Sequence, residues 1–184
     1  MKKITVLGGS GFLGSAFCDY LSELNKYKVI ILDIKKKKNL KRNQKFILGS
    51  TLNINKLKKA IKGSKYVFNF AALADLDISR DKPLETANVN IIGTVNSLIV
   101  SRDFNIKKFI HASSIYANSE QGGFYGASKK ASEDYVERFF SKFGLKYSIL
   151  RFGSLYGKDA GKNNGLNLII DNFFRKKHLI YNGK

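Results

Sequence analysis

The sequence lacks several residue types on which whole classes of protein depend. It contains one cysteine, two histidines and one proline among 184 residues. One cysteine excludes an internal disulfide framework, and together with two histidines it provides too few ligands for a dedicated zinc site. No apolar run is long enough to span a bilayer, and the run at residues 4–7 is too short for the core of a signal peptide. We therefore predict a cytoplasmic protein with no metal and no membrane segment.

Acidic residues are also scarce. The 14 aspartates and glutamates stand against 33 lysines and arginines, which gives a net charge of +19. A charge of this size can indicate nucleic-acid binding. The lysines, however, are spread through nearly every segment, and only Lys35–Lys38 with Arg42 forms a dense patch, which could equally be a solvated loop. We predict no nucleic-acid partner and expect the basic surface to attract an anionic substrate such as a nucleotide sugar.

The chain does have a regular alternation of strand and helix patterns. Predicted strands occupy residues 3–7, 28–32, 45–48, 65–70, 108–112 and 147–150, and helical patterns lie between them, including one long helix that opens at Pro83. Such an alternation predicts βαβ units and a parallel sheet. The predicted fold class is therefore α/β, a doubly wound parallel sheet of the Rossmann type that extends to about residue 150.

A glycine motif follows the first predicted strand. Gly8, Gly11 and Gly14 are part of a G-x-x-G-x-x-G pattern that opens a helix. In this strand–turn–helix context the glycines allow the backbone to approach a pyrophosphate, and the helix N-terminus offers it free N–H groups. Asp33 closes the second strand about twenty residues later, where dinucleotide folds bind ribose hydroxyls. A carboxylate there favours NAD over NADP, although the lysines that follow could neutralise a 2′-phosphate, and Asp33 could also be a turn residue.

A phenol and an ammonium lie four residues apart near the centre of the chain. Tyr125 and Lys129 would share one face of a helix, and the lysine charge would lower the pKa of the tyrosine towards a working range. The pair could also be an ordinary amphipathic contact. Ser114 ends the fifth strand, at the sheet edge where such folds bind ligands, or it caps a turn. His111 is expected to be a structural histidine with satisfied hydrogen bonds.

These segments together resemble the extended short-chain dehydrogenase/reductase family, in particular its NAD-dependent epimerase/dehydratase branch of nucleotide-sugar enzymes. The resemblance covers almost the whole chain, and its segments occur in the order found in the family. They are Gly8–Gly14, Asp33, Asn69–Ala72, Lys82-Pro83 with Asn90–Thr94, Ala112–Ser114, Tyr125–Lys129 and Leu150–Gly157.

The resemblance implies further contacts with NAD. Phe12 and Leu13 would lie against the pyrophosphate, and Ala71 and Ala72 beside the ribose. Asn90 would belong to the hydrogen-bond network on the cofactor side. Each has a structural alternative, since the alanines could be small for packing alone and Asn90 could be a core asparagine bonded to the backbone.

The resemblance also implies a catalytic trio of Ser114, Tyr125 and Lys129. Tyr125, as phenolate, would take the proton of a sugar hydroxyl while a hydride leaves for the nicotinamide. Lys129 would bind the nicotinamide ribose and hold the tyrosine pKa down, and Ser114 would hydrogen-bond the reacting oxygen. The implied protein is an NAD-dependent nucleotide-sugar epimerase or reductase that forms a homodimer.

Several positions depart from the family pattern. Ile115-Tyr116 follows Ser114 where family dehydratases carry an Asp-Glu pair, which argues against a dehydratase. Gly49-Ser50 stands where an acid commonly contacts adenine. Family members have a longer C-terminal part that supplies most of the sugar pocket. We therefore expect an NAD-binding domain at residues 1–150 and only the beginning of a substrate-binding region at 151–184, as a fragment or a natural short form.

Three functions from different classes remain open at this stage. The first is the NAD-dependent nucleotide-sugar enzyme, which the intact tyrosine–lysine pair favours. The second is a non-catalytic dinucleotide-binding module, which the short chain supports. The third is a basic nucleic-acid binder, for which the sequence lacks a motif of interleaved aromatic and basic residues.

Overall fold

The computed structural model describes residues 1–157, 160 and 165–177. The chain divides into two compact units, Met1–Arg151 and Phe152–Lys184. Within the second unit, helix α7 spans Gly165–Lys176, close to the helix predicted at 166–176. The substrate-binding role of this unit remains a prediction.

The centre of the fold is a six-stranded parallel sheet with the order β3-β2-β1-β4-β5-β6. The strands are β1 (Lys2–Leu7), β2 (Tyr27–Asp33), β3 (Gln44–Leu48), β4 (Tyr66–Asn69), β5 (Lys108–Ser114) and β6 (Tyr147–Phe152). This order is that of a doubly wound dinucleotide-binding sheet. The predicted α/β fold of the Rossmann type is confirmed.

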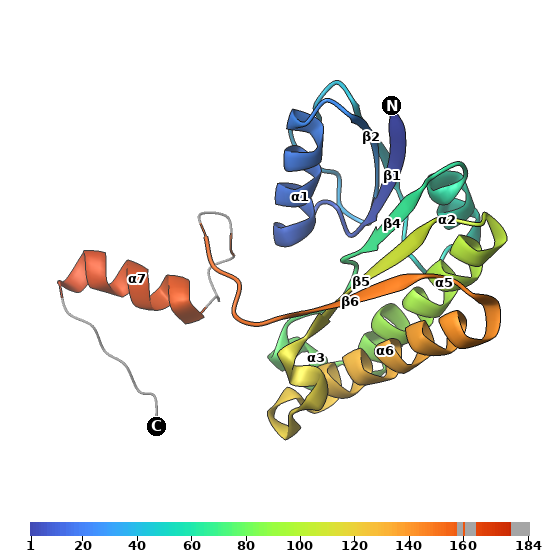
Figure 1. Ribbon diagram of the computed structural model, residues 1–184. Helices are drawn as coiled ribbons and strands as arrows, with labels where there is room; N and C mark the ends of the chain where they lie inside the picture. Colours follow the sequence, from blue (N-terminus) through green and yellow to red (C-terminus); the bar gives the residue numbers. More distant parts are fainter. Residues whose placement is uncertain (158–159, 161–164, 178–184) are drawn as a thin grey trace. The chain divides into compact units, whose positions relative to one another are not determined.

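Helices cover both faces of the sheet (Figure 1). Helix α1 (Phe12–Glu23) lies on one face, and α2 (Ile54–Ile61), α5 (Gly93–Asp103) and α6 (Gly123–Phe143) pack on the other. Short helices α3 (Leu76–Asp81) and α4 (Pro83–Ala87) precede α5, and 3₁₀ turns η2 (Ile115–Asn118) and η3 (Glu120–Gly122) precede α6. The helices therefore bury both sides of the central strands.

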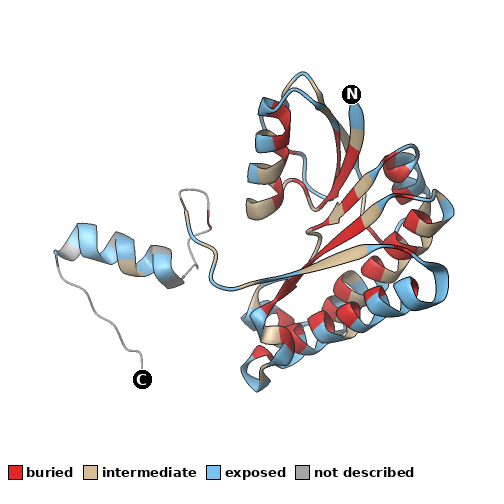
Figure 2. Cartoon of the chain, viewed as in Figure 1, coloured by how far each residue is buried: buried red, intermediate tan, exposed pale blue. Residues whose placement is uncertain are grey.

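Two hydrophobic cores result from this layering. Val6 and Ile31 face the smaller core under α1, whereas Leu7 and Leu32 face the larger core under α2, α5 and α6. Successive side chains of a strand point to opposite faces, so a strand covered on both faces is apolar throughout. Residues Val29–Leu32 are buried without interruption for this reason, and Figure 2 shows the buried central strands between helices with exposed outer sides.

The helix predicted to open at Pro83 is interrupted. A π-helical turn, η1 (Asn88–Ile92), separates α4 from α5. Within this turn Asn90 is 1% exposed and its side chain hydrogen-bonds outside its own helix. Such single π turns are often found at functional sites, and this one lies at a residue with a predicted role.

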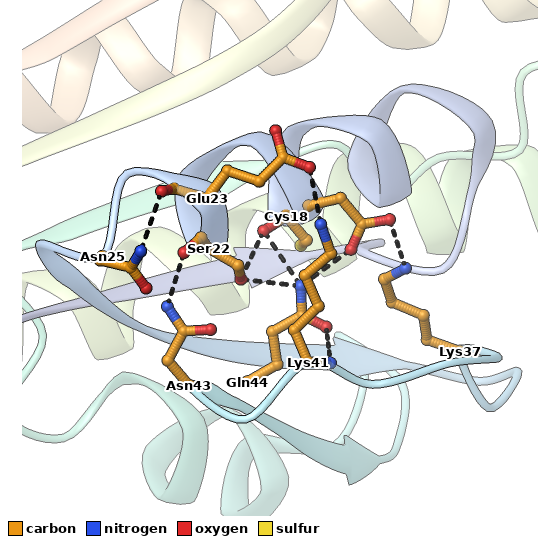
Figure 3. Close-up of polar contacts among 9 residues, drawn as sticks. Cys18, Ser22, Glu23, Asn25, Lys37, Lys41, Asn43 and Gln44 are labelled. Carbon is orange, nitrogen blue, oxygen red and sulfur yellow. Dashed lines mark hydrogen bonds and ion pairs between the residues drawn. The ribbon is translucent and has the colours of Figure 1, made fainter.

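The dense basic patch at residues 35–42 is anchored on helix α1. Lys37 is 7% exposed and pairs with Asp19 at 3.0 Å, and Lys41 pairs with Glu23 at 2.7 Å. The side-chain amide of Gln44 donates to α1 as well, to the Cys18 carbonyl and the Ser22 hydroxyl (Figure 3). It also donates to the Asp19 carboxylate. Two of the positive charges of the patch are therefore neutralised by ion pairs with α1, and the patch is not simply a solvated loop.

None of the helices among the described residues combines the length and the apolar character needed to cross a membrane. The same part of the chain contains no group of three or more histidine, cysteine, aspartate or glutamate side chains placed to hold a metal ion.

Two glycines with similar backbone angles allow a test of the turn after β1. Gly8 has φ +76°, and a Cβ added there would lie 2.5 Å from the Ala71 nitrogen. Gly63 has φ +75° and nothing within 4 Å of such a Cβ. Gly63→Ala should cost about 1–2 kcal/mol of unfolding free energy from the left-handed conformation alone. Gly8→Ala should cost about 1–3 kcal/mol more, because backbone must also move. Urea unfolding measures both, and equal losses would contradict a close approach of Gly8 to Ala71.

Candidate active site

Strands β1 and β4 are neighbours at the centre of the sheet. The chain continues from β1 to β2 on one side of this pair and from β4 to β5 on the other, so the strand order reverses between β1 and β4 and leaves a crevice there. Doubly wound folds bind ligands at this point. The glycine turn follows β1, and Ala71 and Ala72 follow β4. A Cβ on Gly14 would lie 2.2 Å from the Gly8 carbonyl oxygen, so the turn is too tight for any side chain there. The turn is therefore a bare backbone cradle beside the two alanines.

Helix α1 begins directly after this cradle, at Phe12. Its N-cap, Gly11, provides no side-chain cap, and the first turn holds no acidic residue. The positive end of the helix dipole and its first N–H groups are therefore not neutralised by the protein, which is the condition for binding a phosphate. Phe12 and Leu13 lie in this first turn, as the predicted contact with a pyrophosphate requires.

Asp33 lies against the glycine turn. Its carboxylate accepts hydrogen bonds from the backbone N–H of Ser10 at 2.9 Å and of Lys35 at 3.0 Å. The acid predicted for the ribose is thus held at the crevice. Lys37, one of the lysines that could have neutralised a 2′-phosphate there, is instead paired with Asp19 of α1.

Asn90 connects the loop after β4 with helix α6. Its side-chain oxygen accepts from the Leu73 N–H at 2.8 Å, and its amide donates to the Leu73 carbonyl at 3.0 Å and to the Ser128 hydroxyl at 2.9 Å. Ser128 in turn donates to the Tyr125 carbonyl at 2.8 Å. These hydrogen bonds therefore connect Leu73, two residues after Ala71, to the backbone of Tyr125 through Asn90 and Ser128. Both alternatives for Asn90 meet here, since it is a core asparagine bonded to backbone and it also lies beside the crevice.

The predicted trio comes together at the carboxyl end of β5. Ser114, Tyr125 and Lys129 are 6%, 9% and 3% exposed. The Lys129 ammonium donates to the Ala112 carbonyl at 2.8 Å and lies 5.7 Å from the centre of the Tyr125 ring. The Ser114 hydroxyl interacts with Tyr125 and also accepts the Tyr116 N–H at 3.2 Å. Ser114 thus caps a turn and lies beside the tyrosine, so its two readings are compatible.

The η2 turn, which follows Ser114, makes a second close backbone approach, to helix α6. A Cβ added to Gly126 would lie 2.5 Å from the Tyr116 carbonyl oxygen. Glycine at this position lets the η2 turn pack directly on α6. The turn that follows Ser114 is thereby held against the first turns of the helix that carries Tyr125.

The predicted lowering of the Tyr125 pKa is wrong for this structure. Burial raises the pKa of the phenol; the interaction with the Ser114 hydroxyl opposes this rise, and the nearby Tyr116 adds to it. The Lys129 ammonium is held on the Ala112 carbonyl instead of on the phenol oxygen. Helical spacing correctly placed the two residues together, but the desolvation of the phenol outweighs the effect expected from the lysine.

Glu133 is a site residue that the sequence reasoning missed. Burial lowers the pKa of Lys129 to about 8, and the Glu133 carboxylate opposes this. Glu133 is itself 1% exposed and accepts two hydrogen bonds from Arg151 of β6, at 2.8 and 2.6 Å. Burial favours the neutral acid, yet Arg151 and the Ser113 hydroxyl hold the pKa of Glu133 below its ordinary value. Its spacing of four residues from Lys129 was the available signal.

His111 is not the satisfied histidine that was expected. It is 1% exposed, and neither ring nitrogen has a hydrogen-bond partner among the described residues. Burial, and then the charge of Lys129, hold its pKa well below the ordinary value. The ring is therefore neutral and stacks beside Phe109, with centroids 6.5 Å apart.

Comparison with known proteins identifies the family to which this fold belongs. The model of the NAD dependent epimerase/dehydratase family matches residues 4–183. The human dTDP-D-glucose 4,6-dehydratase is 28% identical over 181 residues, which cover 85% of this chain and 52% of the human protein. UDP-glucose 4-epimerase of Thermotoga maritima, solved with UDP-glucose, matches with a TM-score of 0.83 at 33% identity over 94% of this chain and 63% of that one. The Thermus thermophilus UDP-glucose 4-epimerase complex with NAD gives a TM-score of 0.80 at 25% identity over 92% and 60%.

The strand order and the glycine turn thus define a fold of the dinucleotide-binding type. The chain belongs to the NAD-dependent epimerase/dehydratase family. It spans 52% of the human relative and 63% of the Thermotoga chain.

The buried lysine makes stability depend on pH. The pKa of Lys129 falls from 10.5 to about 8 on folding, so between these values only the unfolded chain carries its proton, and stability must rise with pH. The gain from pH 7.5 to 10 should be up to about 3 kcal/mol. Lys129→Met should remove this gain, whereas Lys130→Met, at the exposed neighbour, should keep it. Denaturant unfolding at the two pH values measures the difference, and equal pH dependence in both variants would contradict the burial of the charge.

Proposed function

We propose that the chain is the NAD-binding part of a nucleotide-sugar epimerase, with reductase activity as the nearest variant of the same chemistry. The observation that supports this most strongly is the buried trio of Ser114, Tyr125 and Lys129 at the carboxyl end of β5, which Asn90 links through Ser128 to the loop after β4. An acid–base residue at the edge of a dinucleotide crevice is what oxidation of a sugar hydroxyl requires.

The residues at the crevice suit NAD. Gly8, Gly11 and Gly14 leave room for a pyrophosphate at the N-terminus of α1, and the Asp33 carboxylate is held where it would accept hydrogen bonds from ribose hydroxyls. Ala71 and Ala72 would border the ribose, with Asn90 behind them. Phe12 and Leu13 would lie against the pyrophosphate. When bound, NAD supplies the hydride acceptor and donor of the reaction.

The protein's own part is to move a proton and to hold the reacting oxygen. We propose that the Tyr125 oxygen takes the proton of the sugar hydroxyl and later returns it, while Ser114 hydrogen-bonds the same sugar oxygen. Lys129 supplies positive charge in a buried site, where charge acts strongly. Glu133, one turn further along α6, favours the protonated lysine. The raised pKa of Tyr125 in the free chain means that the phenol is protonated until ligands change its surroundings.

Epimerisation is favoured over dehydration by the residues after Ser114. Ile115 and Tyr116 stand where the dehydratases of the family carry an acid pair. Elimination of water needs such a pair, whereas transfer of a hydride away from a sugar carbon and back does not. The proposed substrate is a nucleotide sugar, and the Thermotoga relative was solved with UDP-glucose.

We also propose that two copies of the chain pair through α4, α5 and α6. Leu84 of α4, Ile92 at the end of η1 and Phe140 of α6 are 75%, 47% and 48% exposed. Large apolar side chains exposed on neighbouring helices are a common basis of homodimers.

A non-catalytic dinucleotide-binding module is the second candidate. The crevice supports it as well, since Gly8, Gly14 and Asp33 would bind NAD whether or not a sugar is turned over. It predicts NAD binding without turnover of any nucleotide sugar. Isothermal calorimetry with NAD, followed by assays on a panel of UDP- and dTDP-sugars, separates the two candidates.

The tyrosine can be tested within one helix. Tyr125→Phe should reduce turnover by about 10²–10⁴-fold, the usual contribution of acid–base catalysis, and should leave the dissociation constant of NAD within about twofold. Tyr135→Phe, at an exposed position of the same helix, should change neither. Sugar oxidation followed by NADH absorbance measures the loss, and full activity of Tyr125→Phe would refute the catalytic assignment.

The carboxylate of Asp33 should select the cofactor. Asp33→Asn should weaken NAD binding and strengthen NADP binding, each by roughly tenfold, because hydrogen bonds to a charged group are lost and repulsion of a 2′-phosphate is removed. Asp134→Asn, on the exposed side of α6, should leave both affinities unchanged. Calorimetric titrations with the two cofactors give the ratio, and an unchanged ratio in Asp33→Asn would place the ribose elsewhere.

A further inference from the structure

A small cavity lies towards the amino edge of the sheet, the edge opposite the dinucleotide crevice. Its volume is about 140 Å³. We refer to it as the amino-edge lysine pocket, and its lining consists of Lys3, Lys28, Ile30, Lys45, Ile47 and Lys59. Strand β1 begins at this edge, next to the N-terminus in Figure 1, and ends at the glycine turn. A six-residue strand spans roughly 20 Å, so the pocket and the crevice are separate sites.

Parallel pairing gathers the lining from segments far apart in the sequence. Lys3 lies opposite Lys28, and Ile30 opposite Lys45. Residues opposite one another, or two apart on one strand, point to the same face. The lysines of β1, β2 and β3 therefore converge on the face that α2 covers, and Lys59 of α2 completes the ring. The buried side chains of Ile30 and Ile47 form the apolar part of the lining.

The pocket collects positive charge that the protein does not neutralise. Its lining contains no carboxylate. None of its four lysines forms an ion pair with a residue that the structure describes, whereas Lys37 and Lys41 are both paired. Burial and the charges of Lys28 and Lys45 lower the pKa of Lys3, whose ammonium donates to the Lys62 carbonyl. Like charges held together in this way are stabilised by an anion between them.

We propose that the amino-edge lysine pocket binds a diphosphate group, either as free inorganic pyrophosphate or as the end of a nucleoside diphosphate. Four lysines that line one small pocket suit a compact multivalent oxyanion, for which lysine is a common ligand. A water molecule occupies about 30 Å³ of liquid, so the cavity holds a few phosphate oxygens but not a nucleoside. The small size of the pocket favours one anionic group over a polynucleotide, which needs a continuous basic track.

The test compares two variants that lose the same charge. Lys28→Ala/Lys45→Ala removes two lysines of the pocket, and Lys38→Ala/Lys58→Ala removes two exposed lysines elsewhere. Calorimetric titration with inorganic pyrophosphate, in the presence of saturating NAD so that the glycine turn is occupied, should give a dissociation constant raised by roughly tenfold or more in the pocket variant. The control variant should stay within about twofold. ADP titrated in the same way distinguishes a nucleotide source from free pyrophosphate.

Two further measurements keep the proposal open to refutation. Without any anion, the pocket variant should unfold at a higher temperature than the unmutated chain, because repulsion among the lysines is relieved. Pyrophosphate should raise the unfolding temperature of the unmutated chain and of the control, but not of the pocket variant. Equal affinities in the two variants would overturn the proposal. A second outcome would also overturn it: a single-stranded oligonucleotide binds more tightly than pyrophosphate, and the pocket variant loses this binding. That result would assign the lysines to a nucleic-acid surface.

Discussion

One asparagine side chain joins the two halves of the site. Asn90 accepts from one N–H and donates to two acceptors, which leaves no donor or acceptor group of its amide unsatisfied in a nearly dry interior. Asn90 hydrogen-bonds the backbone of Leu73, which follows the two alanines after β4, and the hydroxyl of Ser128, which lies on the same helix as Tyr125. A π turn is what directs Asn90 away from its own helix. The relative position of cradle and tyrosine thus rests on these three hydrogen bonds.

Burial determines the protonation of the site more than pairwise charge does. Tyr125, Lys129 and His111 all have pKa values displaced towards their neutral forms, and desolvation is the first cause for each. Glu133 remains charged because Arg151 donates two hydrogen bonds to its carboxylate. At neutral pH the chain by itself therefore holds Tyr125 and His111 neutral, whereas Lys129, with a pKa of about 8, and Glu133 are mainly charged. Under the proposed function, the bound cofactor and substrate supply the change of environment that activates Tyr125.

The sequence predicted much of this arrangement from local patterns. The glycine cradle, the strand-end positions of Asp33 and Ser114, and the i, i+4 pair of Tyr125 and Lys129 all follow from spacing. The direction of the Tyr125 pKa did not, because spacing reports which groups are neighbours but not how much water reaches them. His111 was expected to have partners for the same reason. The spacing of four residues places Glu133 beside Lys129. Its charge, however, is stabilised by Arg151 of β6, eighteen residues away, which spacing does not predict.

The alternation of strands and helices, and with it the parallel sheet and its ligand-binding edge, was determined by the sequence alone, because hydrophobic period and glycine positions are local properties. Only the tertiary structure decided which charges meet. The lysines look dispersed along the chain, yet parallel register brings Lys3, Lys28 and Lys45 to one pocket, while Lys37 and Lys41 are neutralised on α1. Strand order and register are set by packing between distant segments, and no local pattern encodes the resulting electrostatic field.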